Sequence, residues 1–249
     1  STLNTTGRYP EYHKIWEDNE LRVVAIYGKN RVGAKTAADE GIETYNGFVE
    51  RMRDRFGDRI VESTPAKIPE RPGASTPDVE FTADLGDGRR VFVAALLVDE
   101  VATEPDSFFE RYGELSKRAD LILYNGHSGL GANIQALAWN GEWVEGQYAI
   151  VYMNGCDTYA YVDSALWDAH AEINADDPEG TKYLDILMNV LPAPFGSDVD
   201  PTPRLLEVLL NRANPKSYDQ IFRGLLREPV VIVSGEQDNE FDPEKARFQ

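Results

Sequence analysis

Two short segments of this sequence each place a reactive side chain directly after an apolar run and a glycine. The first, "LILYNGHSGLG" (121–131), carries His127 and Ser128, and the second, "YMNGCDT" (152–158), carries Cys156. A cysteine thiolate is a strong nucleophile toward acyl carbons, and an imidazole transfers the protons that such a reaction needs. The chain has one cysteine and three histidines, so Cys156 and His127 are the first pair to consider.

Ser128 is an alternative nucleophile, because Gly126-His127-Ser128 resembles the start of the Gly-x-Ser-x-Gly turn of lipases and esterases. That turn needs a small residue two positions after the serine, and here the position is Leu130. Asp238, after the run "VVIVS", stands where such enzymes carry their acid, but no histidine follows His170. The usual order of serine, acid and histidine therefore cannot be assembled, and a serine hydrolase using Ser128 is the less favoured alternative.

Composition excludes several classes of partner. The chain has 249 residues and a formal net charge of −18, which argues against binding to nucleic acid or to anionic lipid. No apolar run approaches the roughly 20 residues needed to cross a bilayer, so we expect no membrane segment and a soluble protein. The chain begins at Ser1 rather than Met, which is consistent with removal of a leader or an upstream domain, and its compartment is not predicted.

The sequence gives little support for a metal or a cofactor. A single cysteine excludes an internal disulfide and a Cys-rich zinc site. No HExxH, P-loop or GxGxxG pattern occurs. The acidic segment "DNEFDPE" (238–244) does not have the spacing of an EF-hand loop and is interpreted as a solvated tail. We therefore expect no metal site and no cofactor.

Apolar periodicity predicts alternating strands and helices. Strands are expected at 21–27, 59–63, 120–124, 148–153 and 229–234, with a hairpin over 79–98 that turns at Gly86-Asp87-Gly88. Helices are expected from Ile42 to Phe56 and over 105–119, 181–191, 203–211 and 217–226. This alternation predicts one three-layer α/β domain over 1–249, with its core at about 20–235 and a largely parallel sheet of roughly six strands.

In an open parallel sheet, ligands bind beyond the carboxyl ends of the strands. His127 and Cys156 follow consecutive predicted strands at matching points, and adjacent strands lie about 4.8 Å apart, so we expect the two side chains to meet above the sheet. A helix capped by Asp157 or Thr158 and running toward "SALWDAH" would favour the thiolate of Cys156. Backbone N–H groups of Ser128, Gly129 and Cys156 are candidates for binding an oxyanion.

An apolar strand, a histidine among small residues, and a second apolar strand ending in Gly-Cys resemble the caspase-like cysteine peptidases of clan CD. This superfamily includes the caspases, legumains, clostripains, gingipains and separases. The motifs lie within about 120–160, and the order of elements over roughly 20–235 also fits. The resemblance implies a three-layer αβα fold and a cysteine endopeptidase. In that enzyme Cys156 forms a thioester acyl-enzyme, and His127 is the general acid and base.

The resemblance also implies roles for neighbouring residues and for a partner. The family usually has glycine directly after the histidine, whereas here Ser128 precedes Gly129, and both have a backbone N–H for the oxyanion. Asn154, two residues before the cysteine, corresponds to a position that lines the P1 pocket. Arg31, with Lys29, stands where caspases supply part of an acid-binding pocket. The implied partner is a peptide or protein substrate, and calcium stays open because some caspase-like peptidases bind it.

A function from a different class remains open beside the peptidase. The same fold could serve as a catalytically inactive caspase-like module for binding or scaffolding. Loss of either dyad residue would have indicated that role, but both His127 and Cys156 are present, so the peptidase is preferred.

Overall fold

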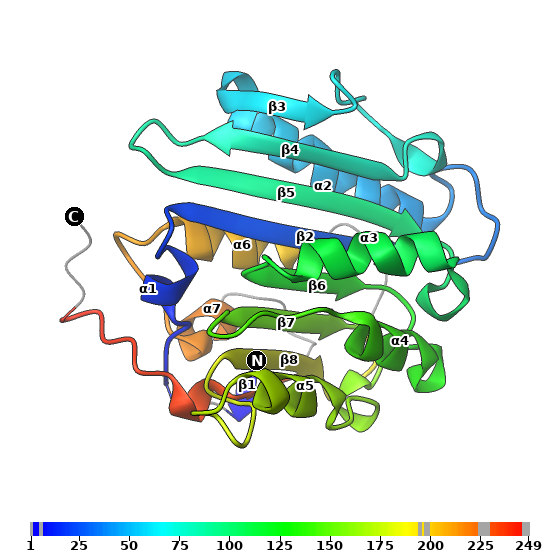
Figure 1. Cartoon of the computed structure of the whole chain (residues 1–249). Helices are drawn as coiled ribbons and strands as arrows, with labels where there is room; N and C mark the ends of the chain where they lie inside the picture. Colours follow the sequence, from blue (N-terminus) through cyan, green and yellow to red (C-terminus); the bar gives the residue numbers. More distant parts are fainter. Residues whose placement is uncertain (1, 5–6, 194–195, 197–199, 224–229, 246–249) are drawn as a thin grey trace.

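The computed structural model describes residues 2–4, 7–193, 196, 200–223 and 230–245, and within them strands and helices alternate along the chain (Figure 1). The strands are β1 (Thr2–Asn4), β2 (Glu20–Gly28), β3 (Ile60–Thr64), β4 (Asp78–Asp84), β5 (Arg90–Val98), β6 (Leu121–Asn125), β7 (Ala149–Asn154), β8 (Leu184–Asn189) and β9 (Val231–Ser234). The α-helices are α1 (Tyr12–Ile15), α2 (Glu40–Phe56), α3 (Asp106–Ser116), α4 (Ala132–Asn140), α5 (Ala165–Ile173), α6 (Thr202–Leu210) and α7 (Tyr218–Arg223).

The strands form one mixed sheet in the order β1-β9-β8-β7-β6-β2-β5-β4-β3. The five central strands β8, β7, β6, β2 and β5 are parallel, whereas β9 runs antiparallel to β8, and β4 runs antiparallel to both β5 and β3. The parallel centre places β2, β6 and β7 side by side, with their carboxyl ends at one edge. That edge carries the loops with Asn30, His127 and Cys156.

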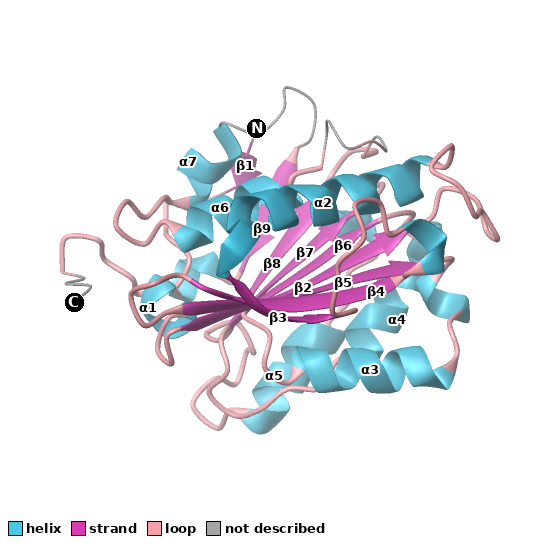
Figure 2. Ribbon diagram, turned by 90° about the horizontal axis from the view of Figure 1, so that it is seen from above, coloured by secondary structure: helices cyan, strands magenta, loops and turns pink. Residues whose placement is uncertain are grey.

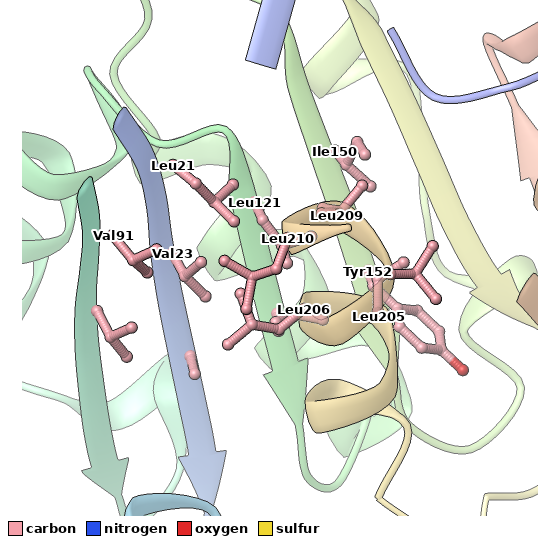
Figure 3. Close-up of a cluster of buried hydrophobic side chains, with 14 of the residues drawn as sticks. Leu21, Val23, Val91, Leu121, Ile150, Tyr152, Leu205, Leu206, Leu209 and Leu210 are labelled. Atoms are coloured by element: carbon pink, nitrogen blue, oxygen red, sulfur yellow. The ribbon is translucent and has the colours of Figure 1, made fainter. Parts of the chain in front are cut away.

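Helices cover both faces of the sheet, as Figure 2 shows from above: α2, α6 and α7 lie on one side, and α3, α4 and α5 lie on the other. The inward side chains alternate along each central strand, so each face has its own buried apolar cluster. On the first face, Leu205, Leu206 and Leu209 of α6 pack against Leu121 and Ile150 of the sheet (Figure 3). The prediction of a three-layer α/β architecture with a largely parallel sheet is confirmed.

Helix α2 shows how local sequence sets the geometry near the candidate site. The carboxylate of Asp39 accepts hydrogen bonds from the N–H groups of Gly41 and Ile42 and caps the helix. The predicted apolar positions of this helix are all buried; they are Ile42, Tyr45, Val49, Met52 and Phe56. This spacing fixes the face that α2 turns toward the sheet, and the cap fixes where the preceding loop ends.

Two predictions about the elements are wrong. The sheet has nine strands rather than roughly six, counting the three-residue β1. The segment 181–191, predicted as a helix, instead contains strand β8, whose residues are buried on both faces. A short apolar run that is buried on both faces lacks the alternation of an exposed strand, and therefore cannot be distinguished from a buried helix by periodicity.

Apart from the helix start expected beside Cys156, the other predicted elements agree with the structure within the described residues. The hairpin over 79–98 forms β4 and β5, joined by a turn closed by the Leu85 N–H and the Arg89 carbonyl. The helix predicted at 203–211 is α6, and the described part of 217–226 contains α7. Residues 224–229, which include the start of the predicted 229–234 strand, lie outside the described residues.

Candidate active site

The candidate site lies where β6 and β7 end side by side. Asn125, the last residue of β6, pairs in register with Asn154, the last residue of β7, and the Gly126 N–H donates to the Asn154 carbonyl at 3.2 Å. His127 and Cys156 each stand two residues beyond this pair. The expected placement of both residues at matching points of one sheet edge therefore holds for the backbone.

Gly155 lets the two loops approach closely. A β-carbon at this position would lie 2.8 Å from the Gly126 carbonyl oxygen and 3.4 Å from the Ser128 nitrogen. The first distance is shorter than any normal contact and involves backbone, which cannot rotate away. Glycine is therefore required before the cysteine because the histidine loop packs directly against it.

His127 is half-buried and is held at both its backbone and its ring. Its carbonyl accepts hydrogen bonds from the Tyr124 hydroxyl at 2.6 Å and from the Asn133 side-chain amide at 2.9 Å. Its Nε2 lies 3.1 Å from the Asn30 carbonyl oxygen and 3.1 Å from Asn30 Oδ1. A carbonyl only accepts, so the contact with Asn30 places the proton on Nε2 and leaves Nδ1 as the basic nitrogen of the neutral ring.

Asn30 is itself fixed by Asp39. The carboxylate that caps α2 also accepts from the N–H groups of Asn30, at 3.0 Å, and of Arg31, at 2.8 Å. The loop after β2 is thus tied to the start of α2, and its carbonyl is held facing the imidazole of His127. Asn30 and Asp39 act on the site by positioning His127, and no sequence pattern indicates this role because 97 residues separate Asn30 from His127.

Cys156 is half-buried, and its thiol donates to the Ala193 carbonyl oxygen at 3.7 Å. This is the one hydrogen bond of the sulfur within the described ranges, so the thiol is not hydrogen-bonded to His127 in this state. Asp157 follows with a left-handed φ of 52°. The two reactive residues therefore share the sheet edge without a direct hydrogen bond between their reactive atoms.

The predicted helix start next to Cys156 is wrong. A single 3₁₀ turn, Thr158–Ala160, follows the cysteine, and α5 begins only at Ala165. The side chains of Asp157 and Thr158 do not cap this 3₁₀ turn. The Thr158 hydroxyl instead donates to the Met153 carbonyl at 2.7 Å and accepts from the Asn189 N–H at 2.9 Å. Because dipole effects decay within a helical turn, α5 does not stabilise a thiolate at Cys156.

A ladder of asparagines fastens the ends of three neighbouring strands. The Asn154 amide donates to Asn125 Oδ1 at 3.2 Å, and the Asn189 amide donates to Asn154 Oδ1 at 2.7 Å and to the Gly155 carbonyl at 3.1 Å. Asn154 is only 7% exposed. The structure therefore places Asn154 inside this ladder, and Asn189, which sequence reasoning missed, helps to hold the loop that carries Cys156.

The ladder continues to a buried acid. Asn125 donates to Asp200 Oδ1 at 3.1 Å, and the Tyr27 hydroxyl donates to Asp200 Oδ2 at 3.0 Å. Burial raises the pKa of Asp200, although hydrogen bonds from Thr202 and Tyr27 oppose that shift. Through Asn125 and Tyr27, Asp200 therefore supports the carboxyl ends of β6 and β2.

The backbone after His127 follows an unusual path. Gly129, Leu130 and Gly131 have consecutive positive φ angles of 61°, 52° and 96°. Ser128 is 7% exposed and Gly129 is exposed, and their N–H groups have no acceptor within the described parts of the chain. The oxyanion role predicted for these two N–H groups stays a prediction.

Arg31 lies on the other side of His127, in the loop after β2. It is exposed and lines a pocket of about 380 Å³ together with Asn30, Lys35, Asp39 and Glu40. Lys29, by contrast, pairs with Asp99 at 3.0 Å and stabilises the loop. Of the two basic residues compared with an acid-binding pocket, Arg31 is therefore the one with an accessible side chain.

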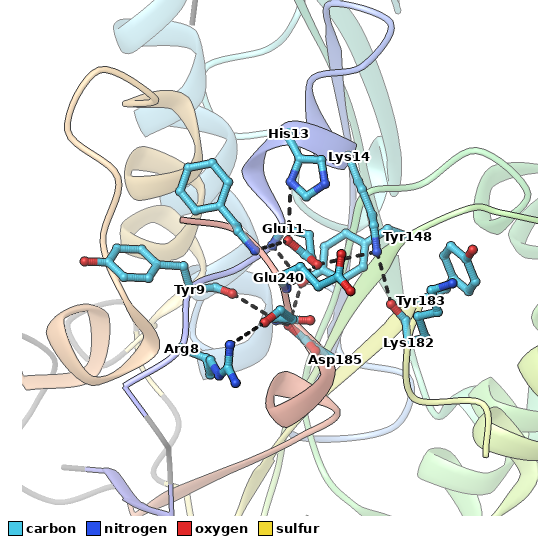
Figure 4. Close-up of polar contacts among 12 residues, drawn as sticks. Arg8, Tyr9, Glu11, His13, Lys14, Tyr148, Lys182, Tyr183, Asp185 and Glu240 are labelled. Carbon is cyan, nitrogen blue, oxygen red and sulfur yellow. Dashed lines mark hydrogen bonds and ion pairs between the residues drawn. The ribbon is translucent and has the colours of Figure 1, made fainter. Parts of the chain in front are cut away.

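The other two histidines lie away from this edge. His13, half-exposed on α1, lies 3.3 Å from the buried Glu11 (Figure 4). His170 of α5 is fully buried beside Trp143, with ring centroids 4.7 Å apart, and burial lowers its pKa to about 4. Asp238, the acid of the serine alternative, accepts a hydrogen bond from the Thr181 hydroxyl at 2.5 Å.

Among the described residues, no three His, Cys, Asp or Glu side chains converge as metal ligands. Within the same ranges, no helix combines the length and the apolar character that a membrane crossing requires.

Comparisons with known proteins found no match for this chain among protein-family models, curated proteins or solved structures.

Proposed function

We propose that this chain is a cysteine endopeptidase of the caspase-like type, with Cys156 as nucleophile and His127 as general acid and base. The observation that carries the proposal is the in-register pairing of Asn125 with Asn154, which brings both residues to the same edge of a parallel sheet. Such edges are where α/β proteins bind their ligands.

The position of Asn30 assigns a direction to proton transfer. Because Nε2 of His127 faces the Asn30 carbonyl, Nδ1 is the nitrogen that takes the proton of the Cys156 thiol. The sulfur attacks the scissile carbonyl carbon and forms a C–S bond. The C–N bond then breaks, and the amine leaves with the proton from Nδ1. A water molecule, deprotonated at the same nitrogen, attacks the thioester, releases the acid and restores the thiol.

The N–H groups of Ser128 and Gly129 supply the charge stabilisation that this sequence of steps requires. Both lie in the loop that Gly155 allows to pack against the cysteine loop. Removing one donor of an oxyanion site in other enzymes costs about 10²–10³ in kcat, so two backbone donors represent a large share of the rate.

The hydrogen bond from Cys156 to the Ala193 carbonyl describes a resting state. The thiol donates to this carbonyl, and the contact holds the sulfur away from His127. Substrate binding must release the sulfur from Ala193 and turn it toward His127. Catalytic hydrogen bonds in unliganded enzymes are commonly long and tighten only in the substrate complex.

Alkylation of Cys156 by iodoacetamide tests the dyad without a known substrate. The protein has one cysteine, so total thiol loss reports this residue alone. Because the sulfur must turn from Ala193 to His127 before it ionises, we expect the wild type to react below pH 8 more slowly than a preformed ion pair but several-fold faster than His127→Ala, whose profile should rise only near the ordinary cysteine pKa of about 8.5. His13→Ala is the matched control and should behave as wild type, whereas identical profiles for all three proteins would contradict the proposal.

The same hydrogen bond to Ala193 favours a second candidate function, an inactive caspase-like module for binding. In that case the thiol is a stable part of the loop packing, and no peptide is cleaved. A fluorogenic peptide library that varies the residue before the scissile bond separates the two functions, because cleavage of any member that is lost in Cys156→Ala supports the peptidase.

A further inference from the structure

Several large apolar side chains that are exposed to solvent lie in loops near the candidate site. In the described residues the exposed large hydrophobic side chains are Val32, Val61, Leu130, Trp139, Val144, Tyr159 and Leu191. Four of these, Val32, Leu130, Tyr159 and Leu191, lie in the loops that follow the carboxyl ends of β2, β6, β7 and β8. Scattered exposed apolar residues need no explanation, but a concentration at one edge of a sheet indicates a binding surface.

Contacts between their immediate neighbours place Leu130, Tyr159 and Leu191 around Cys156. Gly131 packs so closely on Tyr161 that a β-carbon there would lie 3.0 Å from the ring. The Asp157 N–H donates to the Leu191 carbonyl at 3.4 Å. The loops after β6, β7 and β8 are therefore in contact, and the cysteine lies between them.

Leu130 is the most informative of the three. It is 90% exposed and has a φ of 52°, a left-handed conformation that strains a residue with a β-carbon. Its neighbours Gly129 and Gly131 also have positive φ, and Asn133 packs where a Gly129 β-carbon would be, at 3.0 Å. The fold thus holds a strained leucine in solvent, where its side chain contributes nothing to the core.

We infer that Leu130, Tyr159 and Leu191 form an apolar subsite, so that the substrates are peptides with a large apolar side chain within about two residues of the scissile bond. This inference rests on the proposed peptidase function. The occupant follows from position: any chain whose carbonyl reaches Cys156 and the Ser128 and Gly129 N–H groups must pass the side chain of Leu130, two residues beyond Ser128.

The apolar subsite accounts for features that the dyad leaves unexplained. Burying an apolar substrate group against Leu130 removes the cost of exposing it, and one methylene more or less in an apolar site changes kcat/KM by about 10–200-fold. The half-exposed side chains of Tyr159 (54%) and Leu191 (46%) leave the subsite open to solvent on one side. An open subsite selects for apolar character and bulk more than for one particular residue.

The test is a library of internally quenched peptides in which one position at a time, on both sides of the scissile bond, is Leu, Phe, Ser or Glu. We expect wild-type kcat/KM to be at least about tenfold higher for Leu or Phe than for Ser at one position. Leu130→Asn, which suits the left-handed backbone, should reduce that ratio about fivefold or more and leave cleavage of the Ser peptides within twofold. Tyr159→Ser is a second variant and should act in the same direction.

Trp139→Asn is the matched control, because Trp139 is an exposed apolar residue on α4 and no part of the proposed subsite. It should leave the ratio unchanged. Cleavage without apolar preference, or an equal loss for all peptides in Leu130→Asn, would overturn the subsite while leaving the peptidase intact. The absence of any Cys156-dependent cleavage would overturn the proposed function, and the subsite with it.

Discussion

At the amino edge of the sheet, around the starts of β7 and β8, polar side chains are sealed in the interior, whereas at the carboxyl edge the loops after β6 and β7 hold partly accessible ones. Asp185, near the start of β8, is fully buried and accepts from the hydroxyls of Tyr148 and Tyr218, each at 2.5 Å, and from the Asn239 amide at 2.7 Å. At the opposite end, His127 and Cys156 are half-buried. The same strands thus serve two purposes.

The difference between the two ends comes from what covers them. Glu11, beside α1, accepts the N–H groups of Glu240 and Phe241 at 2.7 and 2.8 Å, so segments near both ends of the chain close over the amino edge (Figure 4). At the carboxyl edge, by contrast, the loop after β6 turns through Gly129, Leu130 and Gly131, all with positive φ. Both edges contain ionisable groups: Glu11 and Asp185 are sealed at the amino edge, whereas His127 and Cys156 are half-buried at the carboxyl edge.

The largest expected effect is the loss of turnover on removing the dyad. Cys156→Ala and His127→Ala should each lower kcat by about 10³-fold or more, because the nucleophile and its proton carrier act as a unit. Thermal unfolding should shift by no more than a few degrees, because both side chains are half-buried in loops. Substantial turnover by Cys156→Ala would contradict the mechanism.

At the amino edge, a substitution is expected to lower the stability of the fold without changing the reactivity of Cys156. Asp185→Ala removes the acceptor of three buried donors and should lower the free energy of unfolding by about 3–5 kcal/mol, as measured in urea. Alkylation of Cys156 in the folded protein should not change. Asp58→Ala, at an exposed acid after α2, is the control and should have almost no effect. A change in Cys156 reactivity would show that the two edges are coupled.

The stability contributions of two buried groups, His170 and Asp185, change with pH in opposite directions. Burial lowers the pKa of His170 to about 4, so the unfolded chain binds the extra proton and stability is lost as pH falls from about 6.5 to 4. Burial raises the pKa of Asp185 to about 7, so the folded state holds the extra proton and stability is lost as pH rises from 3.8 toward 7.

Two variants isolate these opposing slopes in urea titrations at pH 4.5, 5.5 and 6.5. Relative to His170→Leu, the wild type should lose about 2 kcal/mol as pH falls through this window. Relative to Asp185→Asn, the wild type should instead lose stability as pH rises through it. Parallel curves for the wild type and either variant would contradict the corresponding assignment.

Gly155→Ala tests the close packing of the two loops that carry the dyad. The new methyl group would press on the Gly126 carbonyl from 2.8 Å, so the loops must separate, at a cost of about 1–3 kcal/mol in unfolding free energy. Turnover should fall more steeply than stability, since the Ser128 N–H moves with the histidine loop. Full activity in this variant would show that the loop spacing is not critical.

The smallest expected effect is that of removing the Ser128 hydroxyl while its backbone N–H is kept. Ser128→Ala keeps the N–H and the φ of the residue, and should change kcat/KM by less than about threefold. A loss of about 10³-fold would instead support the serine hydrolase alternative.

The strands that carry His127 and Cys156 could be predicted because each is a β-rich apolar run that ends at Asn-Gly. Only part of the asparagine ladder could be predicted from the sequence. Asn125 and Asn154 follow predicted strands, but Asn189 lies in a segment that was predicted as a helix. The helix expected at Asp157 was wrong because the Thr158 hydroxyl bonds back to Met153 and to Asn189 instead of capping a helix. Both wrong predictions involve Asn189 of β8, and the sequence alone does not say which strands lie beside β8.

By itself, the sequence determined the reactive residue types, the apolar strands that precede them, and the glycines that let the chain turn at 126 and 155. Only the tertiary structure decided that β2 lies beside β6, which brings the Asn30 carbonyl to within 3.1 Å of His127 Nε2. It also decided that the Cys156 thiol donates a hydrogen bond to the Ala193 carbonyl and that the Leu130 side chain is exposed to solvent. Residue type and periodicity are local properties, whereas strand order depends on how the helices pack over the whole sheet.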